Sequence, residues 1–321
     1  MLYNKKVAIY LAIHNHYSLL DTILKSIEVF NCSITLFITP ELKPNYENDL
    51  RISQIEYISQ KTYIKRSQIK LLNLHDMVIF DELTSFKELA AFSFFKIKTG
   101  KVMIIHDCDS WFKPSLPKGL KNYLKYIFSR VVKNKFKVFA VAGSNMKRYL
   151  QQTLLQRNVF LIPFRYADFN ADKDITPEYV PGKIIRICVP GTISKRRNYD
   201  KLLDNLCTPV LKDKVLIDIL GQAIGEYGSR IINRIKALNK SGFNVLYQEG
   251  FINNDSFDES VRKAHLILSD FETDYYTNNG QKEVYGITKE TGVAVLMLNK
   301  AKVGLMPASF NQMEEIKNQT L

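Results

Sequence analysis

Short apolar runs alternate with stretches of helical periodicity through the first half of the chain. A buried strand of a parallel sheet reads as a continuous run of about 4–8 apolar, often β-branched residues. By that criterion we predict strands over 7–13, 33–39, 55–59, 77–83, 102–105, 137–141 and 158–162. Apolar residues at helical spacing predict helices among them, over 19–27, 119–132 and 146–155.

A polar connector with Pro177 and Pro181-Gly182 interrupts this pattern at 166–183, after which the alternation restarts. The second half has predicted strands over 184–189, 215–220, 244–247, 266–269 and 301–305, and predicted helices over 199–206, 231–238, 257–264, 291–297 and 313–317. Strand–helix alternation in both halves predicts an α/β fold of two doubly wound, Rossmann-like domains that face each other across a cleft. The expected boundaries are 1–165, a linker at 166–183, 184–308 and a C-terminal helix or tail at 309–321.

Composition excludes several classes of protein. Of the 321 residues, 46% are hydrophobic and 24% are charged, which excludes a disordered, collagen-like or coiled-coil chain. The apolar run Val7–Ile13 is short for a signal peptide, and no run approaches the roughly 20 residues of a membrane span. The four cysteines show no CxxC spacing. We therefore expect a cytoplasmic protein without a zinc or disulfide framework.

The net charge of +13 is confined to the first half of the chain. Residues 1–165 hold 25 Lys and Arg against 12 Asp and Glu, whereas residues 166–321 hold 20 of each. Between residues 110 and 167 there are 12 Lys and Arg and no acid. We interpret the apolar face of the helix at 119–132 as part of the core. Its cations predict peripheral attachment to the anionic inner face of the plasma membrane: Lys118, Lys121, Lys125, Arg130 and Lys133. Nucleic acid is not expected, because no nucleic-acid-binding motif accompanies the charge.

The first candidate binding motif is Pro190–Tyr199, where the end of a predicted strand, a turn, three cations and the start of a helix follow one another. A glycine after a strand allows close approach of the backbone, and a helix N-terminus with guanidinium groups suits a diphosphate. The candidate diphosphate ligands are Gly191, Thr192, Lys195, Arg196 and Arg197.

Two further motifs follow in the second half. Gln248–Ile252 lies between a predicted strand and helix, and the next strand ends at Ser269-Asp270-Phe271. Tyr285–Gly292 reads Gly-x-x-x-Glu-x-Gly from its second residue and precedes a predicted helix.

Together these three motifs resemble the nucleotide-sugar domain of GT-B glycosyltransferases, in particular the small bacterial enzymes of capsular and surface polysaccharide assembly. The resemblance implies that 184–308 binds the donor and 1–165 the acceptor. It also implies that Phe251 and Ile252 contact the nucleobase, that Glu290 binds the ribose and that Lys289 adds charge near the diphosphate. The donor would be a nucleotide diphosphate sugar, UDP-sugar favoured, with no other cofactor. Glu283 lies one position closer to Glu290 than the Glu-x7-Glu pair of retaining members requires. We interpret it as a surface charge, with Asp270 or Glu272 near the sugar instead.

The predicted acceptor half has its own candidate residues. A strand ends in the pair His106-Asp107, either of which can act as a general base toward an acceptor hydroxyl. Trp111, the only tryptophan, is a candidate for stacking on a sugar or touching lipid. His14, Asn15 and His16 follow the first strand and are expected at the cleft. No third ligand accompanies the two histidines, so no metal is expected.

The sequence therefore predicts a hexosyltransferase-type enzyme of bacterial surface polysaccharide synthesis. Its expected acceptor is a glycan linked to lipid by polyprenyl diphosphate. A sugar-nucleotide epimerase and a non-catalytic subunit that binds membrane or glycan are the alternatives. The donor base, the sugar, the stereochemistry and the oligomeric state stay open.

Overall fold

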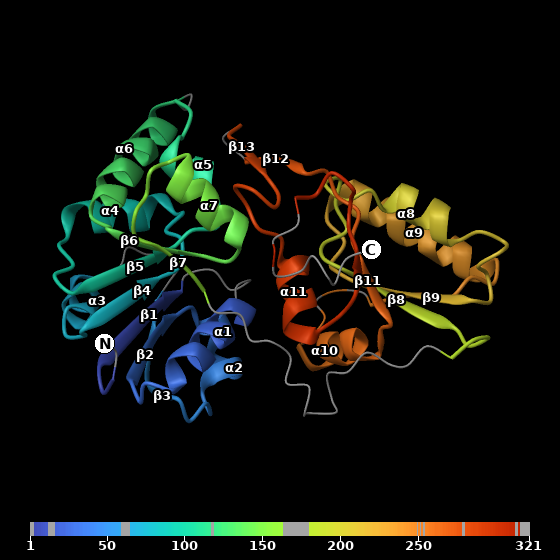
Figure 1. Cartoon of the computed structure of the whole chain (residues 1–321), viewed down its shortest axis with the longest axis horizontal. Coiled ribbons are helices and arrows are strands. Elements are labelled where there is room, and N and C mark those ends of the chain that lie inside the picture. The colour runs from blue at the N-terminus through green and yellow to red at the C-terminus, as the bar shows by residue number, and fades with distance from the viewer. Residues whose placement is uncertain are drawn as a thin grey trace. The chain divides into compact units, whose positions relative to one another are not determined.

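The computed structural model describes residues 3–11, 17–58, 65–116, 119–162, 180–248, 250, 252, 254–277, 280–311 and 314 (Figure 1). By its contacts the chain forms two units. Unit 1 comprises Met1–Arg165 and Tyr276–Glu290, and unit 2 comprises Tyr166–Tyr275 and Thr291–Leu321. Most of the predicted linker and nearly all of the predicted terminal helix lie outside the described residues.

Unit 1 is built on a parallel seven-stranded sheet in the order β3-β2-β1-β4-β5-β6-β7. The order reverses between β1 and β4, which makes this the topological switch point. Each strand overlaps a predicted apolar run, as the bounds show: β1 (Lys6–Leu11), β2 (Ser33–Ile38), β3 (Ile52–Tyr57), β4 (Met77–Phe80), β5 (Gly100–Ile104), β6 (Val138–Val141) and β7 (Val159–Leu161).

Helices cover both faces of this sheet because each face supplies a separate apolar core. On one face α1 (Tyr17–Glu28) and α2 (Lys43–Tyr46), with the 3-10 turn Pro40–Leu42 between them, pack on the first strands. The other face is covered by α3 (Arg66–Leu72), α4 (Phe86–Phe94), α5 (Cys108–Phe112) and α7 (Ser144–Gln152), with α6 (Leu120–Asn134) alongside α4. Figure 1 shows α6 and α4 side by side.

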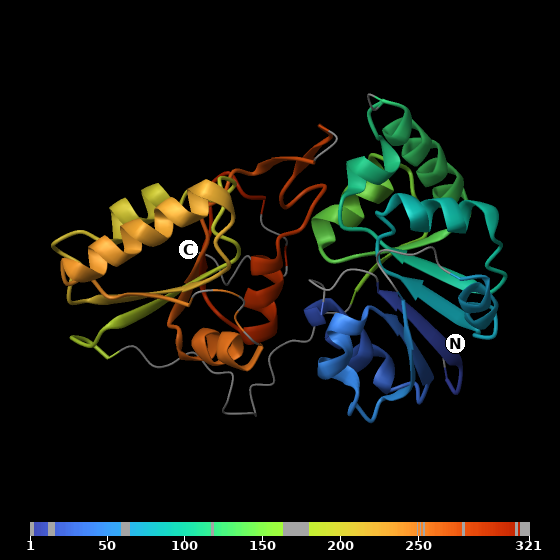
Figure 2. The ribbon, with the colours of Figure 1, turned by 180° about the vertical axis from the view of Figure 1, so that it is seen from behind.

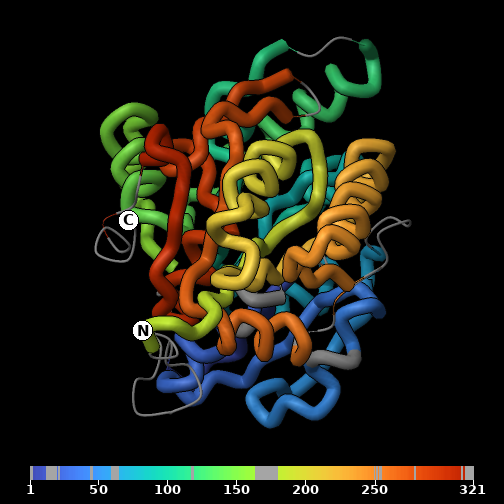
Figure 3. The backbone as a smooth tube through the Cα atoms, turned by 90° about the vertical axis from the view of Figure 1, so that its right-hand side faces the viewer, coloured from blue at the N-terminus to red at the C-terminus, as the bar shows by residue number. Residues whose placement is uncertain are grey.

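Unit 2 repeats the design with five parallel strands in the order β10-β9-β8-β11-β14. The strands are β8 (Ile185–Pro190), β9 (Val215–Leu220), β10 (Val245–Tyr247), β11 (Leu266–Leu268) and β14 (Gly304–Leu305). One face carries α8 (Tyr199–Leu206) and α9 (Gly225–Lys240), which run side by side (Figures 1 and 3). The other carries α10 (Asn254–Lys263) and α11 (Gly292–Lys300) (Figure 2). The switch point lies between β8 and β11. The predicted fold class, two doubly wound α/β domains, is confirmed.

One segment is grouped differently from the sequence prediction. Residues 276–290 were expected in the second domain, but their contacts place them in unit 1. Within the segment, β13 (Lys282–Val284) packs on α5 and forms a two-stranded sheet with β12 (Asp274–Tyr276), only the last residue of which belongs to the segment. The Cys108 amide donates to the Thr288 carbonyl at 2.8 Å, and the Asn145 side-chain amide to the Gly286 carbonyl at 3.0 Å. Local sequence pattern carries no information about such contacts between distant parts of the chain.

Two glycines bring the loops after β8 and β9 into direct contact. The Gly191 amide donates to the Leu220 carbonyl at 3.0 Å, and the Ile193 amide to the Gln222 carbonyl at 2.9 Å. A Cβ on Gly221 would overlap the Gly191 carbonyl group, so only glycine fits there without backbone movement. Gly191 itself has φ +103°, a conformation that other residues rarely adopt.

We expect Gly221→Ala to lower the free energy of unfolding by about 1–3 kcal/mol, the usual cost of overpacking that forces a backbone shift. The matched control is Gly292→Ala, where an added Cβ meets no atom within 4 Å. It should change stability by less than about 1 kcal/mol. Urea unfolding of both variants measures the difference, and equal stabilities would contradict the close approach.

Candidate functional site

Polar side chains gather where β4 and β5, neighbouring parallel strands, end beside the switch point of unit 1. Asp81 and Glu82 follow β4, which ends three residues earlier than predicted. His106 and Asp107, the predicted catalytic pair, follow β5. Asp81 and Glu82 were missed because the sequence reads them as the end of the strand. Two acids directly after a buried strand were the available signal.

His106 and Asp81 form a histidine–carboxylate pair. His106 Nε2 lies 2.6 Å from Asp81 Oδ1, and the side chains are 23% and 4% exposed. A neutral imidazole that donates Nε2–H to the carboxylate carries its lone pair on Nδ1. The carboxylate would also stabilise the imidazolium after proton uptake. This geometry favours His106 over Asp107 as the general base.

Glu82 is a buried carboxyl group surrounded by donors. It accepts from the His106 amide at 2.7 Å, the Asp107 amide at 3.2 Å and the Trp111 indole N–H. Burial and then the nearby Asp107 carboxylate hold the pKa of Glu82 well above its usual range. Glu82 therefore fixes the loop that carries His106.

Asp107 pairs with Lys289 rather than standing alone as a base. Lys289 Nζ bonds Asp107 Oδ1, and the two residues also form an isolated antiparallel bridge. Burial lowers the pKa of Lys289, but the Asp107 carboxylate outweighs that effect, so the net pKa is raised. Lys289, which was predicted to add positive charge near the donor diphosphate, is therefore neutralised by Asp107 of the same unit.

Glu283 is not the surface charge that the sequence suggested. Its side chain is 0% exposed and accepts from the Asp109 amide at 3.2 Å and the Ser110 amide at 2.6 Å. Burial raises its pKa, opposed by hydrogen bonds from Thr288 and Ser110. The carboxylate therefore joins β13 to the start of α5.

Trp111 is a core residue, so its prediction as a surface for sugar or lipid is wrong. It is 6% exposed and belongs to the apolar cluster between the sheet and α4. The Trp111 ring packs in this cluster, and its indole N–H donates a hydrogen bond to Glu82.

A second polar site follows β8 in unit 2, where the cation motif was predicted to bind a diphosphate. Three tyrosine contacts set the shape of this loop. Tyr199 donates its hydroxyl to the Gly191 carbonyl at 2.9 Å. Tyr227 donates to the Arg197 carbonyl at 3.1 Å and accepts from the Tyr199 amide at 3.1 Å. The Asn198 side chain caps α8 by accepting from the Lys201 amide.

The three cations of the loop have different environments. Arg197 is half-buried, donates to Ser269 Oγ and lies where a Cβ on Gly191 would be. The Arg197 guanidinium group therefore occupies the space that a side chain at position 191 would need. Arg196 is exposed and stacks over the Tyr275 ring with its guanidinium carbon 4.6 Å from the centroid. Lys195 is exposed.

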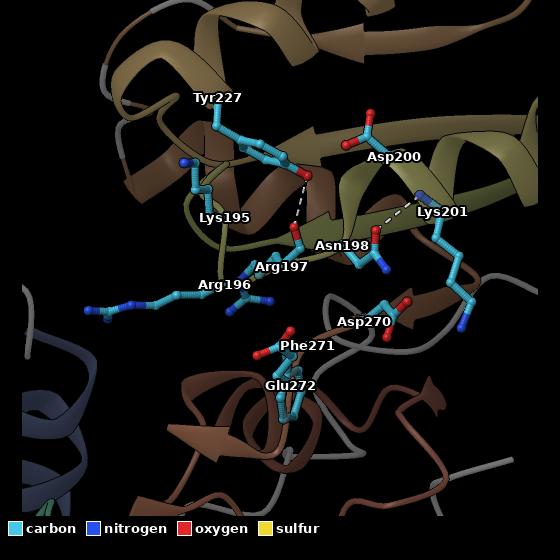
Figure 4. A pocket seen from close by; sticks show the side chains of 10 residues that line it. All are labelled: Lys195, Arg196, Arg197, Asn198, Asp200, Lys201, Tyr227, Asp270, Phe271 and Glu272. Atoms are coloured by element: carbon cyan, nitrogen blue, oxygen red, sulfur yellow. Dashed lines mark hydrogen bonds between the residues drawn. The ribbon is translucent and has the colours of Figure 1, made fainter. Parts of the chain in front are cut away.

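These residues border a pocket of about 450 Å³ at the switch point of unit 2 (Figure 4). Its walls come from the loop after β8, the first turn of α8, Tyr227 of α9 and the segment after β11. The lining residues are Lys195, Arg196, Arg197, Asn198, Asp200, Lys201, Tyr227, Asp270, Phe271 and Glu272. Asp270 and Glu272, the acids expected near a sugar, are thus in the same pocket as the predicted cations.

The pocket carries an excess of positive charge that suits an anion. Asp200 is paired with Arg230 at 2.6 Å and Arg234 at 3.1 Å, and hydrogen bonding to Arg230 lowers its pKa. Of the charges that line it, four cations remain against Asp270 and Glu272. The cations can neutralise a diphosphate, while the two carboxylates can accept hydrogen bonds from hydroxyl groups.

Of the other predicted site residues, some are described by the structure and some are not. Thr192 is exposed, Ile252 is half-buried, and Glu290 is half-buried with a buried Oε2 atom in unit 1. Lys121 and Arg130 are exposed, whereas Lys125 and Lys133 are half-buried. The predictions that fall outside the described residues are His14, Asn15, His16, Lys118 and Phe251.

Among the residues that the structure describes, no three His, Cys, Asp or Glu side chains are arranged to hold a metal ion. None of the described helices is both long enough and apolar enough to span a membrane.

No protein-family model matches the sequence, and no curated protein matches it. Solved structures do match. HepE from Anabaena, in complex with UDP and glucose, matches over 96% of this chain and 82% of its own, with 12% identity and a TM-score of 0.61. A glycosyltransferase from Rickettsia africae matches over 98% and 82%, with 12% identity and a TM-score of 0.59. UDP-GlcNAc 2-epimerase from Methanocaldococcus jannaschii matches over 98% and 88%, with 10% identity and a TM-score of 0.52. The likeness establishes the GT-B fold.

Because burial raises the pKa of Glu82, the folded protein binds a proton there that the unfolded chain releases near the ordinary pKa. Stability from this group is therefore present at low pH and decreases as pH rises above about 4.5. We expect the free energy of unfolding of Glu82→Gln, minus that of the wild type, to increase between pH 5 and 8. Denaturant titrations at several pH values measure it. Glu28→Gln, at an exposed position, is the control, and a difference that stays flat or falls would contradict the assignment.

Proposed function

We propose that the protein is a glycosyltransferase that moves a sugar from a nucleotide diphosphate sugar, UDP-sugar favoured, to an acceptor hydroxyl. The observation that carries the proposal is the cationic pocket at the switch point of unit 2. Open α/β sheets bind ligands at this position. HepE, which shares the fold, was solved with UDP and glucose bound.

In this proposal the pocket binds the donor. Lys195, Arg196 and Arg197 hold the diphosphate, aided by the α8 N-terminus and the backbone at Gly191 and Thr192. The leaving diphosphate gains charge as the glycosidic bond breaks, so fixed cations stabilise the transition state more than the bound donor. The remaining donor contacts stay as predicted: Asp270 or Glu272 for the sugar, Glu290 for the ribose, and Phe251 and Ile252 for the base.

For a reaction that inverts the anomeric centre, His106 is the proposed base. Its ring accepts the proton of the acceptor hydroxyl while that oxygen bonds the sugar carbon and the nucleoside diphosphate departs. Asp81 orients the ring and stabilises the imidazolium. Lys289 holds Asp107 and is a positioning residue in this scheme.

We place the acceptor at the inner face of the plasma membrane, as a polyprenyl-diphosphate-linked glycan of surface polysaccharide synthesis. The support is the charge asymmetry: the excess of cations lies in residues 1–165, and the remainder of the chain is balanced. Such an acceptor is anionic and embedded in an anionic surface. The protein would act there as a peripheral membrane protein on the cytoplasmic side.

The epimerase among the similar structures defines the alternative reaction. An epimerase converts a UDP-sugar into another UDP-sugar and needs no acceptor. A transferase passes the sugar to an acceptor and forms no second UDP-sugar. NMR of a UDP-sugar incubated with the protein alone therefore separates the two functions.

For the donor site, we expect UDP to raise the melting temperature without added metal. A ligand at 100 times its Kd stabilises the folded state by about 2.7 kcal/mol. Lys195→Ala should weaken UDP binding about 10–100-fold, because a charge-assisted contact contributes about 1.5–3 kcal/mol. Lys240→Ala, an exposed lysine of the same unit at the end of α9, is the matched control. If UDP, GDP, CDP and CMP all fail to stabilise the protein at millimolar concentration, the proposal is wrong.

For the base, we expect His106→Asn to lower kcat about 10²–10⁴-fold, the usual contribution of a positioned general base. The UDP-induced rise in melting temperature should persist, because His106 is not part of the donor pocket. Asp81→Asn should lower kcat in the same direction. An unchanged kcat in His106→Asn would exclude this residue as the base, and a lost UDP response would show a folding defect instead.

A further inference from the structure

The outward side of α6 is apolar. Leu120 is 75% exposed, Tyr123 47%, Leu124 36%, Ile127 37% and Val131 40%. With successive residues about 100° apart, these five positions lie on one side of the helix. We call them the α6 stripe. No other helix has more than one large apolar side chain exposed, among the side chains that the structure describes. The interpretation of this face as core is therefore wrong.

Residues outside the stripe explain why it faces outward. Val132 is buried, and the Phe128 ring lies 5.6 Å from Phe86 and 5.8 Å from Phe94 between centroids. Ser93 Oγ donates to the Phe128 carbonyl at 3.2 Å. Lys135 Nζ donates to the carbonyls of the last turn of α4. The helix is thus fixed to α4 by its inner face and cannot turn its stripe inward without losing these contacts.

Cations border the stripe. Lys121 and Arg130 are both exposed and lie on the two flanks of the helix, with Arg130 about 20° and Lys121 about 60° from the nearest stripe residue on the same projection. Lys125 and Lys133 face the domain, where burial lowers the pKa of both side chains. Lys133 lies over the Phe112 ring, 5.4 Å from its centroid. Of the predicted membrane-binding cations that the structure describes, Lys121 and Arg130 are therefore the two placed to meet an external surface.

Exposed apolar residues continue beyond the helix. Leu116, just before it, is 75% exposed, and Phe94, whose ring contacts Phe128, is 77% exposed. A helix with an apolar side, basic edges and an aromatic residue such as Tyr123 is typical of segments that lie in a membrane interface.

We propose that α6 inserts its stripe into an anionic lipid surface, with Lys121 and Arg130 at the lipid headgroups. This rests on the membrane location proposed above and not on the transfer reaction. A lipid surface fits better than a protein partner because lysine is depleted in protein interfaces, whereas here it borders the apolar patch. Nucleic acid does not fit, since it offers no apolar surface for five such side chains.

The test is flotation of the full chain with vesicles of phosphatidylglycerol and phosphatidylcholine. We expect Leu124→Ser/Ile127→Ser to weaken binding at least 10-fold even at low salt. Lys121→Gln/Arg130→Gln should weaken it less, and this loss should vanish at high salt, where the charges are screened. Leu155→Ser/Val210→Ser, two positions 77% and 71% exposed elsewhere on the surface, is the matched control and should bind as the wild type does.

Insertion is separated from adsorption by fluorescence. Trp111 is the only tryptophan and is buried, so lipids brominated in their chains should not quench the wild type. Ile127→Trp should be quenched. Binding without quenching would overturn insertion, and an unaffected stripe variant would overturn the role of α6.

Two further outcomes are diagnostic. If the wild type does not bind vesicles but self-associates through the stripe, α6 is a protein interface and the proposal fails. The UDP melting assay, run on the same samples, keeps the two hypotheses apart. A UDP response without vesicle binding refutes only the insertion, and vesicle binding without a UDP response refutes only the transferase.

Discussion

A buried carboxyl group needs hydrogen-bond donors, and this need of Glu82 shapes the candidate site of unit 1. Its donors are the amides of His106 and Asp107 and the indole of Trp111. The loop after β5 therefore wraps around one side chain of the neighbouring strand end. That conformation presents His106 to Asp81 and Asp107 to Lys289. The geometry of the candidate base therefore follows from the hydrogen bonds that Glu82 requires.

Unit 2 fixes its loop by different means. There the backbone is shaped by tyrosine hydroxyls and by two glycines in contact, and Arg197 fills the space over Gly191. The loop consequently needs no ligand to hold its form. A preorganised cationic site loses less conformational entropy when it binds an anion. Arg197 is held in place by its contacts with Ser269 and Gly191, whereas Lys195 and Arg196 are exposed.

The order of strands and helices was predictable because apolar runs and helical periodicity are local signals. The helices α3 and α4 were missed for local reasons as well. The sequence of α4 is apolar nearly all around, so it shows little amphipathic contrast, although its Ser85–Glu88 capping box was a readable start signal. The cation loop was predictable since turn, charge and helix are adjacent in sequence. Trp111 and Glu283 were misassigned because each is buried by partners far away in the chain. The exposure of the apolar side of α6 could not be predicted, because it depends on which side of the helix packs against α4. Helical periodicity identifies an apolar side but does not show what covers it.

The contacts of residues 276–290 have a consequence for how the chain is made. The amides of Asp109 and Ser110 at the start of α5 obtain their acceptor from Glu283, more than 170 residues later. On the ribosome the seven strands of unit 1 emerge long before that carboxylate exists, and water must serve α5 in the meantime. Four of the five strands of unit 2 are synthesised before the last piece of unit 1 arrives. Unit 1 is therefore completed only after most of unit 2 has been made, and a gene fragment that stops at the end of β7 encodes an incomplete domain.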